Sequence, residues 1–424
     1  MNKKFFVLAA VGLLLTVSNT VEAQTDTSRW TTTATDGGGL GLGDATTLTW
    51  GIVADGTGIV PQFGGESNDP SSLISFLDTN IGAGAGGADL TNRPWFGLFE
   101  NIYGRWGEVS GLSFNYEPND NDAPIGGGFN PGVLGTVADL RIGGHSIDGQ
   151  TGGNTLAYNF FPNNGDMVID TDNVAFYSNP ANNFVALRNV LAHEVGHGLG
   201  LPHLESNNSQ NLLEPFINLN FDGPQLDDIH QAQRRYGDQL EENGGNDTTG
   251  TATNLGIVTA GTLAVGSDAN RTNTQLVLPT DIDFLTIDDD SDVDIFEFTI
   301  FENFDITFTL DMVGAQYNRG PEGGTQSAFD LASLSDLDLR ILAGDGTTVL
   351  GTSNMTGLDL TETIDLFLTA GTYFVELTGR NNAAQFYELT LLASSSPIPE
   401  PSSMLVLGLF GGLFLRRRRN VFKA

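Results

Sequence analysis

Three histidines and a glutamate lie within one short segment of the chain, at spacings suited to holding a metal ion. His193 and His197 are four residues apart, so on a helix both imidazoles point from one face and can reach the same ion. Glu194 stands next to the first histidine, where its carboxylate can hold a metal-bound water and accept its proton. This spacing predicts a metal-dependent hydrolase with Glu194 as its general base.

Gly200 explains how a third histidine joins the pair. A helix that continued without a break would carry His203 about 9 Å beyond His197 and turn it away. A glycine can adopt the left-handed conformation that ends a helix, which lets the chain bring His203 back toward the ion. Three nitrogens on one ion, with a fourth position open to water, is the usual arrangement of a catalytic zinc. We therefore expect one catalytic zinc on His193, His197 and His203.

The segment before the first histidine should form the helix that this site needs. Leu187, Val190 and Leu191 supply a buried face at helical spacing, and Asn182 or Asn183 can cap the start. The alternative is a surface helix that happens to be rich in histidine. The complete motif, H-E-x-x-H-x-x-G-x-x-H, arises by chance in roughly 1 of 10,000 chains of this length, which favours the metal site.

The motif and its flanks resemble the matrixin-like branch of the metzincin zinc peptidases. Residues 226–237 are similar to the closing helix of matrixins, 95–116 to their long helix and following strand, and 138–142 to the strand before their ion-binding loops. The resemblance implies an α+β catalytic domain, with a twisted mixed sheet, long helices and a zinc-binding active-site helix. On the closing helix, His230 is expected to be solvated and not to be a fourth ligand.

The chain departs from the family in the turn beneath the zinc, where matrixins have a methionine. Leu213 occupies that position. Leucine nearly conserves the volume of methionine, and such a replacement usually costs less than about 1.5 kcal/mol. We expect unchanged or reduced activity. The resemblance also implies that Leu213, Pro215 and Phe216 belong to the substrate pocket, which receives the residue after the cleaved bond.

Two further ion sites of matrixins are only partly represented. His145 and Asp148 are present for a structural zinc, but Tyr158 stands at a later histidine position, and two ligands do not close a zinc site. We expect this zinc to be lost, leaving one per chain. Asp170 and Asp172 stand where the family holds calcium. A solvated acidic turn is an equally good interpretation of these two residues.

Composition shifts divide the chain of 424 residues, which is too long for one typical core. The predicted parts are a signal peptide at 1–23, a matrixin-like catalytic domain at 24–238, a polar linker at 239–254, a β-sandwich at 255–394 and a sorting segment at 395–424. The chain contains no cysteine, which excludes both disulfides and latency through a thiolate on the zinc.

An antiparallel β-sandwich is predicted from short strands with a period of two, separated by turns. It resembles the bacterial pre-peptidase C-terminal domain, chiefly at 292–296 and 370–375. Such domains accompany secreted peptidases. The acidic run at 288–290 is either a calcium site or a solvated loop.

Both ends of the chain resemble export signals. Lys3 and Lys4 precede an apolar run and a small-residue cleavage site that ends at Ala23. At the other end, Pro-Glu-Pro at 399–401, an apolar stretch and four arginines resemble the PEP-CTERM sorting signal, which an exosortase removes at the inner membrane. The apolar stretch would span about 18 Å as a helix, less than the ~30 Å of a bilayer core. An ordinary membrane anchor is the alternative.

The chain is strongly acidic, with a formal net charge of −34. Removal of both predicted processing segments takes away seven basic and two acidic residues, which makes the net charge −39. Such a chain should not bind nucleic acid or anionic membranes by charge, and it should attract divalent cations.

These observations predict a secreted or surface-sorted zinc-dependent metalloendopeptidase, in which Glu194 activates a zinc-bound water. Its partners would be protein or peptide substrates and the exosortase-type sorting machinery, with transient association of the tail with the inner membrane. The alternative is a weak or inactive surface or biofilm-matrix binding protein on a metzincin scaffold. Replacement of the turn methionine and loss of the structural zinc motivate this alternative, whereas the intact ligands and Glu194 argue against it.

Overall fold

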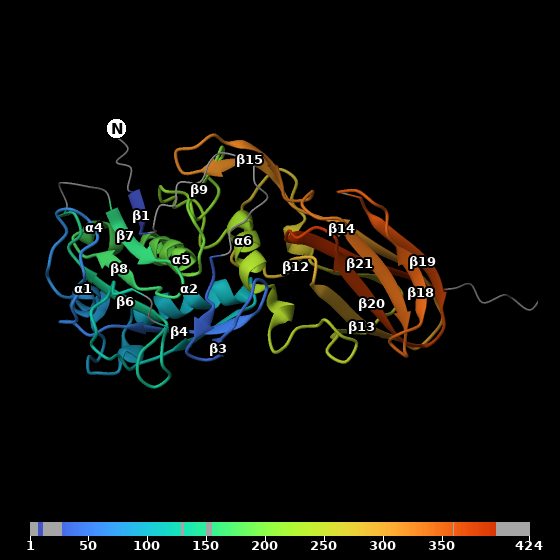
Figure 1. Cartoon of the computed structure of the whole chain (residues 1–424), viewed down its shortest axis with the longest axis horizontal. Helices are drawn as coiled ribbons and strands as arrows, with labels where there is room; N and C mark the ends of the chain where they lie inside the picture. The colour runs from blue at the N-terminus through green and yellow to red at the C-terminus, as the bar shows by residue number, and fades with distance from the viewer. Residues whose placement is uncertain (1–6, 12–27, 129–130, 150–154, 359, 396–424) are drawn as a thin grey trace, which may run out of the picture.

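The computed structural model describes residues 7–11, 28–128, 131–149, 155–358 and 360–395. An N-terminal α/β part and a C-terminal β region lie side by side along the long axis of the molecule (Figure 1). The apolar run and arginines predicted as a sorting signal lie outside the described residues. Within the described part of the chain, no helix is both long and apolar enough to cross a membrane.

The α/β part is built on a six-stranded mixed sheet. Its strand order is β1-β7-β8-β6-β4-β5, in which β7 runs antiparallel to β8 and the remaining pairs are parallel. The strands are β1 (Val7–Val11), β4 (Thr46–Ile52), β5 (Leu112–Tyr116), β6 (Leu140–His145), β7 (Thr155–Phe160) and β8 (Met167–Asp170). Because β1 lies within the predicted signal peptide, its removal would leave β7 at the edge of the sheet.

Two long helices, α2 (Phe96–Glu108) and α5 (Val185–Gly198), pack on each other and on this sheet. On α2, Phe99, Ile102, Tyr103 and Trp106 follow the spacing of one helical face, and all four are buried. Each fully buried large apolar side chain contributes about 1.5–3 kcal/mol. The indole Nε1 of Trp106 also donates to the carbonyl of Ala192 at 3.1 Å, which ties α2 to the active-site helix.

Shorter elements complete the α/β part. They are β2 (Thr32–Thr33), β3 (Gly37–Gly38), α1 (Leu73–Leu77), the π turn η1 (Asp78–Gly82), the 3-10 turns η2 (Leu90–Asn92) and η3 (Gln239–Glu241), α4 (Val174–Tyr177), β9 (Leu204–Ser206) and α6 (Leu226–Tyr236).

The start of α5 differs from the sequence prediction. Asn182, Asn183 and Phe184 all have positive φ, at 49°, 55° and 57°, and no side chain caps the helix. Arg188 instead reaches back and donates to the carbonyls of Asn182 and Asn183, at 3.2 and 2.9 Å. The predicted asparagine cap is therefore wrong. Both asparagines have a left-handed backbone and precede the helix, and neither side chain accepts a hydrogen bond from its first turn.

Helix α6 lies between the α/β part and the β region, and all of its residues are buried (Figure 1). His230 is 1% exposed, and its Nε2 lies 2.9 Å from the carbonyl oxygen of Ala384 in the β region. The prediction of a solvated His230 is therefore wrong. The helix resembles a surface helix in sequence, but the second half of the chain covers it.

The C-terminal region is largely β, as the period of two predicts. One five-stranded sheet has the order β10-β13-β20-β17-β18, and a second runs β11-β21-β14-β19 with β12 paired to β21. The strand pairs are antiparallel, as predicted, except that β10 runs parallel to β13. Phe298 on one sheet and Phe308 on the other have ring centroids 5.8 Å apart within a shared apolar core. The elements are β10 (Thr253–Ile257), β11 (Gly261–Val265), η4 (Ser267–Ala269), β12 (Leu285–Ile287), β13 (Val293–Ile300), β14 (Phe304–Met312), β17 (Leu337–Ala343), β18 (Val349–Ser353), β19 (Glu362–Leu368), β20 (Gly371–Gly379) and β21 (Gln385–Ser395).

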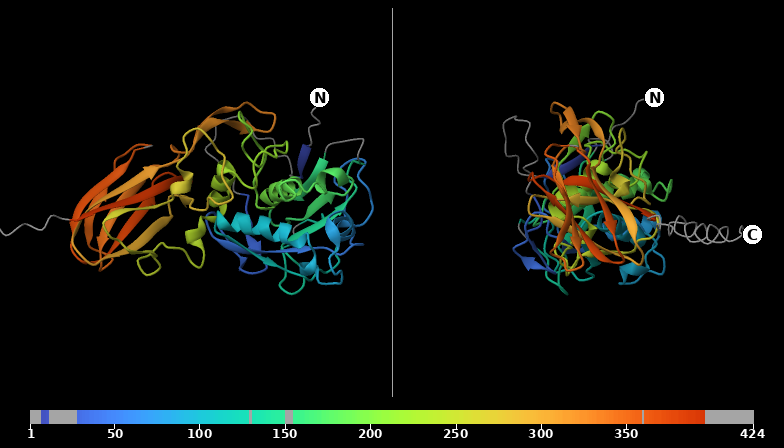
Figure 2. Two further views of the ribbon diagram at one scale, coloured as in Figure 1. Left: turned by 180° about the vertical axis from the view of Figure 1, so that it is seen from behind. Right: turned by 90° about the vertical axis from the view of Figure 1, so that its right-hand side faces the viewer.

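A hairpin of the C-terminal region extends back over the α/β part. Strands β15 (Gln316–Pro321) and β16 (Ser327–Asp330) form a three-stranded sheet with β9, in the order β16-β15-β9. Figures 1 and 2 show this hairpin bridging the two parts. The strand that follows the histidine motif is therefore paired with the second half of the chain.

Candidate metal centre

The structure brings the three predicted zinc ligands together. The Nε2 atoms of His193 and His197 are 3.0 Å apart, and each lies 3.2 Å from Nε2 of His203. The first two histidines lie on one face of α5, and the third follows the end of the helix. Three ring nitrogens without intervening side chains therefore converge on one point.

Gly200 makes the turn that returns His203 to the other two ligands. Its φ is +99°, a conformation that L side chains rarely adopt. A Cβ atom at this position would lie 2.1 Å from the carbonyl oxygen of Ser28. The position therefore requires glycine for both backbone conformation and space, which supports the role predicted for it.

The opposite ring nitrogens hold each histidine in place. Nδ1 of His193 and of His197 lies 2.7 Å from the carbonyl oxygens of Leu212 and Leu201, respectively. Burial, together with the neighbouring imidazoles, lowers the pKa of His193 and His197 well below the usual value. Burial also lowers the pKa of His203. The rings are therefore neutral near pH 7, with lone pairs available to a metal.

Glu194 provides the observation that tests whether these residues fit a zinc ion. It is fully buried, and neither of its carboxylate oxygens has a hydrogen-bond partner among the described residues. Burial raises its pKa well above the usual range. A buried carboxylate without partners is strongly destabilising, unless an ion and its water complete the site. Tetrahedral zinc ligands with bonds of 2.0–2.1 Å are about 3.3 Å apart, close to the observed spacing of the nitrogens.

Leu213 lies beneath the centre, at the position expected for the turn methionine. Its side chain is buried against Gly196 of α5, where an added Cβ would come within 2.9 Å of a Leu213 methyl carbon. Asp228 of α6 accepts hydrogen bonds from the backbone N–H groups of Leu212 at 2.7 Å and Leu213 at 3.1 Å. Sequence reasoning did not assign Asp228 a role, although the paired aspartates of the closing helix marked the position.

Residues 88–237 match the family model described as matrixin. This segment holds α2, α5, α6 and all the residues of the metal centre. The matrixin resemblance is thus supported for about a third of the chain, and curated metalloendoproteinases match the chain at modest sequence identity.

Two curated relatives illustrate the matrixin match. Metalloendoproteinase 2-MMP of Arabidopsis thaliana is 30% identical over 155 residues, which cover 35% of this chain and 38% of the relative. The hatching enzyme of Paracentrotus lividus is 30% identical over 181 residues, covering 40% of this chain and 26% of the relative. The chain therefore spans about two fifths or less of the length of these relatives.

Solved structures resemble the C-terminal region only weakly. The pre-peptidase C-terminal domain of a collagenase from Bacillus anthracis covers 33% of this chain and 93% of its own, at 12% identity and a TM-score of 0.19. A C-terminal CBM6 of LamC from Zobellia galactanivorans covers 31% of this chain and 98% of its own, at 11% identity and a TM-score of 0.17. These likenesses carry no argument about what the region binds.

The predicted substrate-pocket residues belong to the turn beneath the candidate metal centre and to the segment directly after it. Leu213 and Pro215 are buried, whereas the side chain of Phe216 is 46% exposed. A pocket formed by these three residues remains a prediction.

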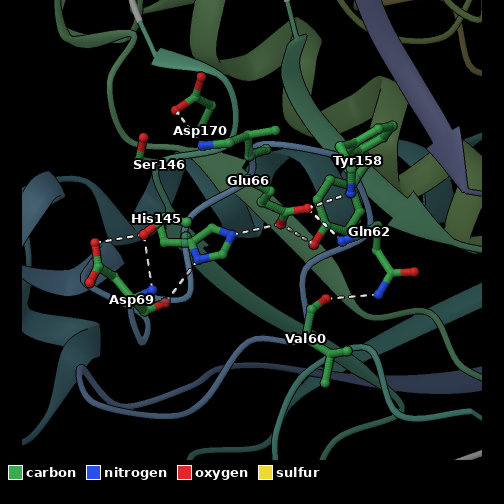
Figure 3. A network of polar contacts seen from close by, with 12 residues as sticks. Val60, Gln62, Glu66, Asp69, His145, Ser146, Tyr158 and Asp170 are labelled. Atoms are coloured by element: carbon green, nitrogen blue, oxygen red, sulfur yellow. Dashed lines mark hydrogen bonds and ion pairs between the residues drawn. The ribbon is translucent and has the colours of Figure 1, made fainter.

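His145 and Tyr158, which stand at positions of the structural zinc site of matrixins, belong to the hydrogen-bond network shown in Figure 3. Nε2 of His145 lies 2.7 Å from Oε1 of Glu66, and Nδ1 lies 2.9 Å from the carbonyl oxygen of Asp69. The Tyr158 hydroxyl donates to the same Glu66 oxygen at 2.8 Å. Asp148 accepts from the backbone of Thr155 at 2.9 Å. Sequence reasoning missed Glu66, which lies far from its partners in the chain.

Asp170 and Asp172, the calcium candidates, make protein contacts in the loop after β8. Asp170 accepts from the backbone of Ile147 at 3.2 Å and of Asp172 at 3.0 Å, and burial raises its pKa to about 6. Asp172 accepts from the hydroxyl of Ser146 at 2.5 Å. These contacts favour a loop held by aspartate hydrogen bonds, and a calcium ion there remains a prediction.

A second group of carboxylates lies where the linker meets the β region. One oxygen from each of Glu241, Asp247 and Asp292 lies within 4.8 Å of the others. Burial, with added repulsion from neighbouring carboxylates, raises the pKa of Glu241 to about 8 and that of Asp288 to about 7. Of the acidic run at 288–290, Asp288 is buried, so a wholly solvated loop is the wrong interpretation for that residue.

These raised pKa values predict that stability falls as the pH increases. The folded chain holds protons on Glu241 and Asp288 at pH values where the unfolded chain has lost them, so stabilisation is lost as the pH rises through about 7 and 8. We expect the thermal midpoint to drop by several degrees between pH 6.5 and 8.5 in calcium-free buffer at constant ionic strength. This window lies above the lowered pKa values of the buried histidines.

The measurement is differential scanning fluorimetry of the wild type, Glu241→Gln and a control, Glu302→Gln, on an exposed turn of the β region. Glu241→Gln should reduce the dependence on pH, and Glu302→Gln should not. An unchanged slope in Glu241→Gln would show that Glu241 does not contribute to it.

Proposed function

We propose that the chain is a secreted or surface-sorted zinc-dependent endopeptidase. The observation that supports this most directly is the fully buried Glu194 carboxylate beside three converging histidine nitrogens. Bound zinc would supply a Lewis acid that polarises the scissile carbonyl and lowers the pKa of a water molecule.

The chain's own residues would carry out the remaining steps. His193, His197 and His203 hold the ion through Nε2. Glu194 accepts a proton from the attacking water and passes it to the amine that leaves as the peptide bond breaks. Leu213, Pro215 and Phe216 would line the pocket for the residue after the cleaved bond.

The proposal also includes export and ion content. The signal-like N-terminus would direct the chain out of the cytoplasm, and the PEP-CTERM-like tail would deliver it to sorting machinery at the inner membrane before cleavage. One zinc per chain is expected, because His145 and Asp148 are too few ligands for a closed second site, and His145 and Tyr158 both hydrogen-bond to Glu66. Calcium could be held at Asp170 and Asp172.

Zinc depletion tests the proposed activity. Casein or a peptide library should be cleaved by the chain, and dialysis against 1,10-phenanthroline should reduce cleavage to the background rate because the polarising ion is lost. Stoichiometric zinc should restore it. The control is the same chelator saturated with zinc beforehand, which should leave activity intact.

Two outcomes would count against a zinc endopeptidase. Cleavage at an undiminished rate after all zinc has been removed would exclude a zinc mechanism. A chain that holds one zinc but cleaves no protein or peptide would favour the alternative, a binding protein on a matrixin scaffold.

A further inference from the structure

Of the three zinc-ligand candidates, only His203 has its Nδ1 atom hydrogen-bonded to a residue of the C-terminal region. Nδ1 of His203 lies 2.8 Å from Oε2 of Glu322, which is 119 residues further along the chain. The other two histidines are held by carbonyl oxygens of the matrixin segment itself. His203 is therefore held in place by a residue that lies outside the matrixin segment.

Backbone pairing brings the chain around Glu322 next to the chain around His203. Strands β15 and β9 are antiparallel, with Arg319 opposite Ser206, Gly320 opposite Glu205 and Pro321 opposite Leu204. Glu322 directly follows β15, and His203 directly precedes β9. The paired strands therefore bring the two residues close together, so that the contact does not depend only on the rotamer of an exposed side chain.

Side chains secure the same hairpin on both sides. Arg319 forms an ion pair with the fully buried Asp227 of α6, and its guanidinium lies 3.2 Å from the ring centroid of Phe329 on β16. Asn207 and Asn318 exchange two hydrogen bonds: the Asn207 backbone N–H donates to the carbonyl of Asn318 at 3.0 Å, and the Asn318 N–H donates to Oδ1 of Asn207 at 2.9 Å. The hairpin is therefore fixed to the matrixin segment.

We propose that Glu322 is a positioning residue for the zinc ligand His203, so that the β15–β16 hairpin of the C-terminal region completes the metal centre. This inference rests on the proposed function, since it assumes that the three histidines hold zinc. Nδ1–H of His203 donates to the Glu322 carboxylate, which leaves the Nε2 lone pair directed at His193 and His197. A carboxylate in this position fixes the ring orientation and increases the basicity of the coordinating nitrogen.

Loss of Glu322 should weaken zinc binding without unfolding the chain. Removal of a hydrogen-bond partner of a metal-binding histidine typically costs about 10–100-fold in metal affinity. We expect that loss for Glu322→Ala in the full chain. Glu322→Gln keeps an acceptor oxygen but removes the charge, and should lose less. Glu302→Ala, which removes an exposed glutamate from the turn between β13 and β14, should bind zinc like the wild type.

The measurement is zinc competition between each metal-free protein and a chromophoric chelator, with the thermal midpoint of the metal-free protein as a second readout. Weaker zinc binding by Glu322→Ala, partial recovery in Glu322→Gln and equal metal-free midpoints would support the inference. Equal zinc affinity in the wild type and Glu322→Ala would overturn it, as would a lowered metal-free midpoint with unchanged zinc affinity.

The outcomes also separate this inference from the proposed function. If the wild type holds no zinc, the proposed function fails and the inference fails with it. If the wild type binds zinc and hydrolyses peptides but Glu322→Ala binds zinc equally well, only the inference fails. If Glu322→Ala does not fold, Glu322→Gln gives the same comparison with a nearly isosteric side chain.

Discussion

Replacement of Glu194 by glutamine should reduce kcat/KM for peptide hydrolysis by about 10²–10⁴-fold, the range typical of a lost general acid–base group. The amide has nearly the shape of the carboxylate but cannot accept the proton of the attacking water. Because Glu194 has no protein hydrogen-bond partner among the described residues, the substitution breaks no visible contact of the fold.

The check is steady-state hydrolysis of a fluorogenic peptide together with the zinc content of each protein. Glu194→Gln should retain one zinc per chain, since the ligand atoms belong to the three histidines. Glu100→Gln changes an exposed glutamate of α2 and serves as the matched control, with wild-type kinetics expected. Wild-type activity in zinc-loaded Glu194→Gln would remove this residue from the mechanism.

Gly200→Ala should damage the metal centre through the backbone. The new Cβ would meet the carbonyl oxygen of Ser28 at 2.1 Å, so the turn that carries His203 must move. Displacement of a catalytic group by about 1 Å can cost about 10²-fold in rate. We expect a loss of at least that size in kcat/KM, with weaker zinc binding, because one of three ligands no longer reaches the ion.

Gly56→Ala separates the steric clash from the conformational strain. Gly56 has a φ of +101°, nearly that of Gly200, but an added Cβ would have no atom within 4 Å. Both variants suffer the unfavourable φ, and only Gly200→Ala also suffers the contact with Ser28. Gly56→Ala should lower the thermal midpoint by a few degrees and leave kinetics and zinc affinity intact. Similar zinc affinities in the two variants would mean that the clash is absorbed without moving His203.

The arrangement of the metal centre was largely predictable because its residues are local in the chain. His193, His197 and Glu194 belong to one helix, whose periodicity dictates that the two imidazoles share a face. Gly200 required only the general property of glycine at positive φ, observed here at +99°. The period-two pattern likewise predicted a largely β C-terminal region, since alternation depends on neighbours two residues apart.

Two predictions made from local sequence were wrong. His230 was expected to be solvated from the pattern of its own helix, but the β region buries it. Asn182 and Asn183 are good cap residues in type, yet their left-handed backbone prevents capping. At His230, packing against the β region outweighed the polar character of the residue. At the two asparagines, the backbone conformation before α5 outweighed their preference for the cap position.

The sequence by itself determined the candidate metal-binding motif, because all of its proposed ligands and its proposed general base lie within eleven residues whose spacing is set largely by helix geometry. Only the tertiary structure revealed the groups that hold those residues in place. Asp228 supports the turn under the metal, and Glu322 reaches His203 from 119 residues away. Such partners are brought together by strand register and helix packing, and no periodicity in the chain encodes those pairings directly.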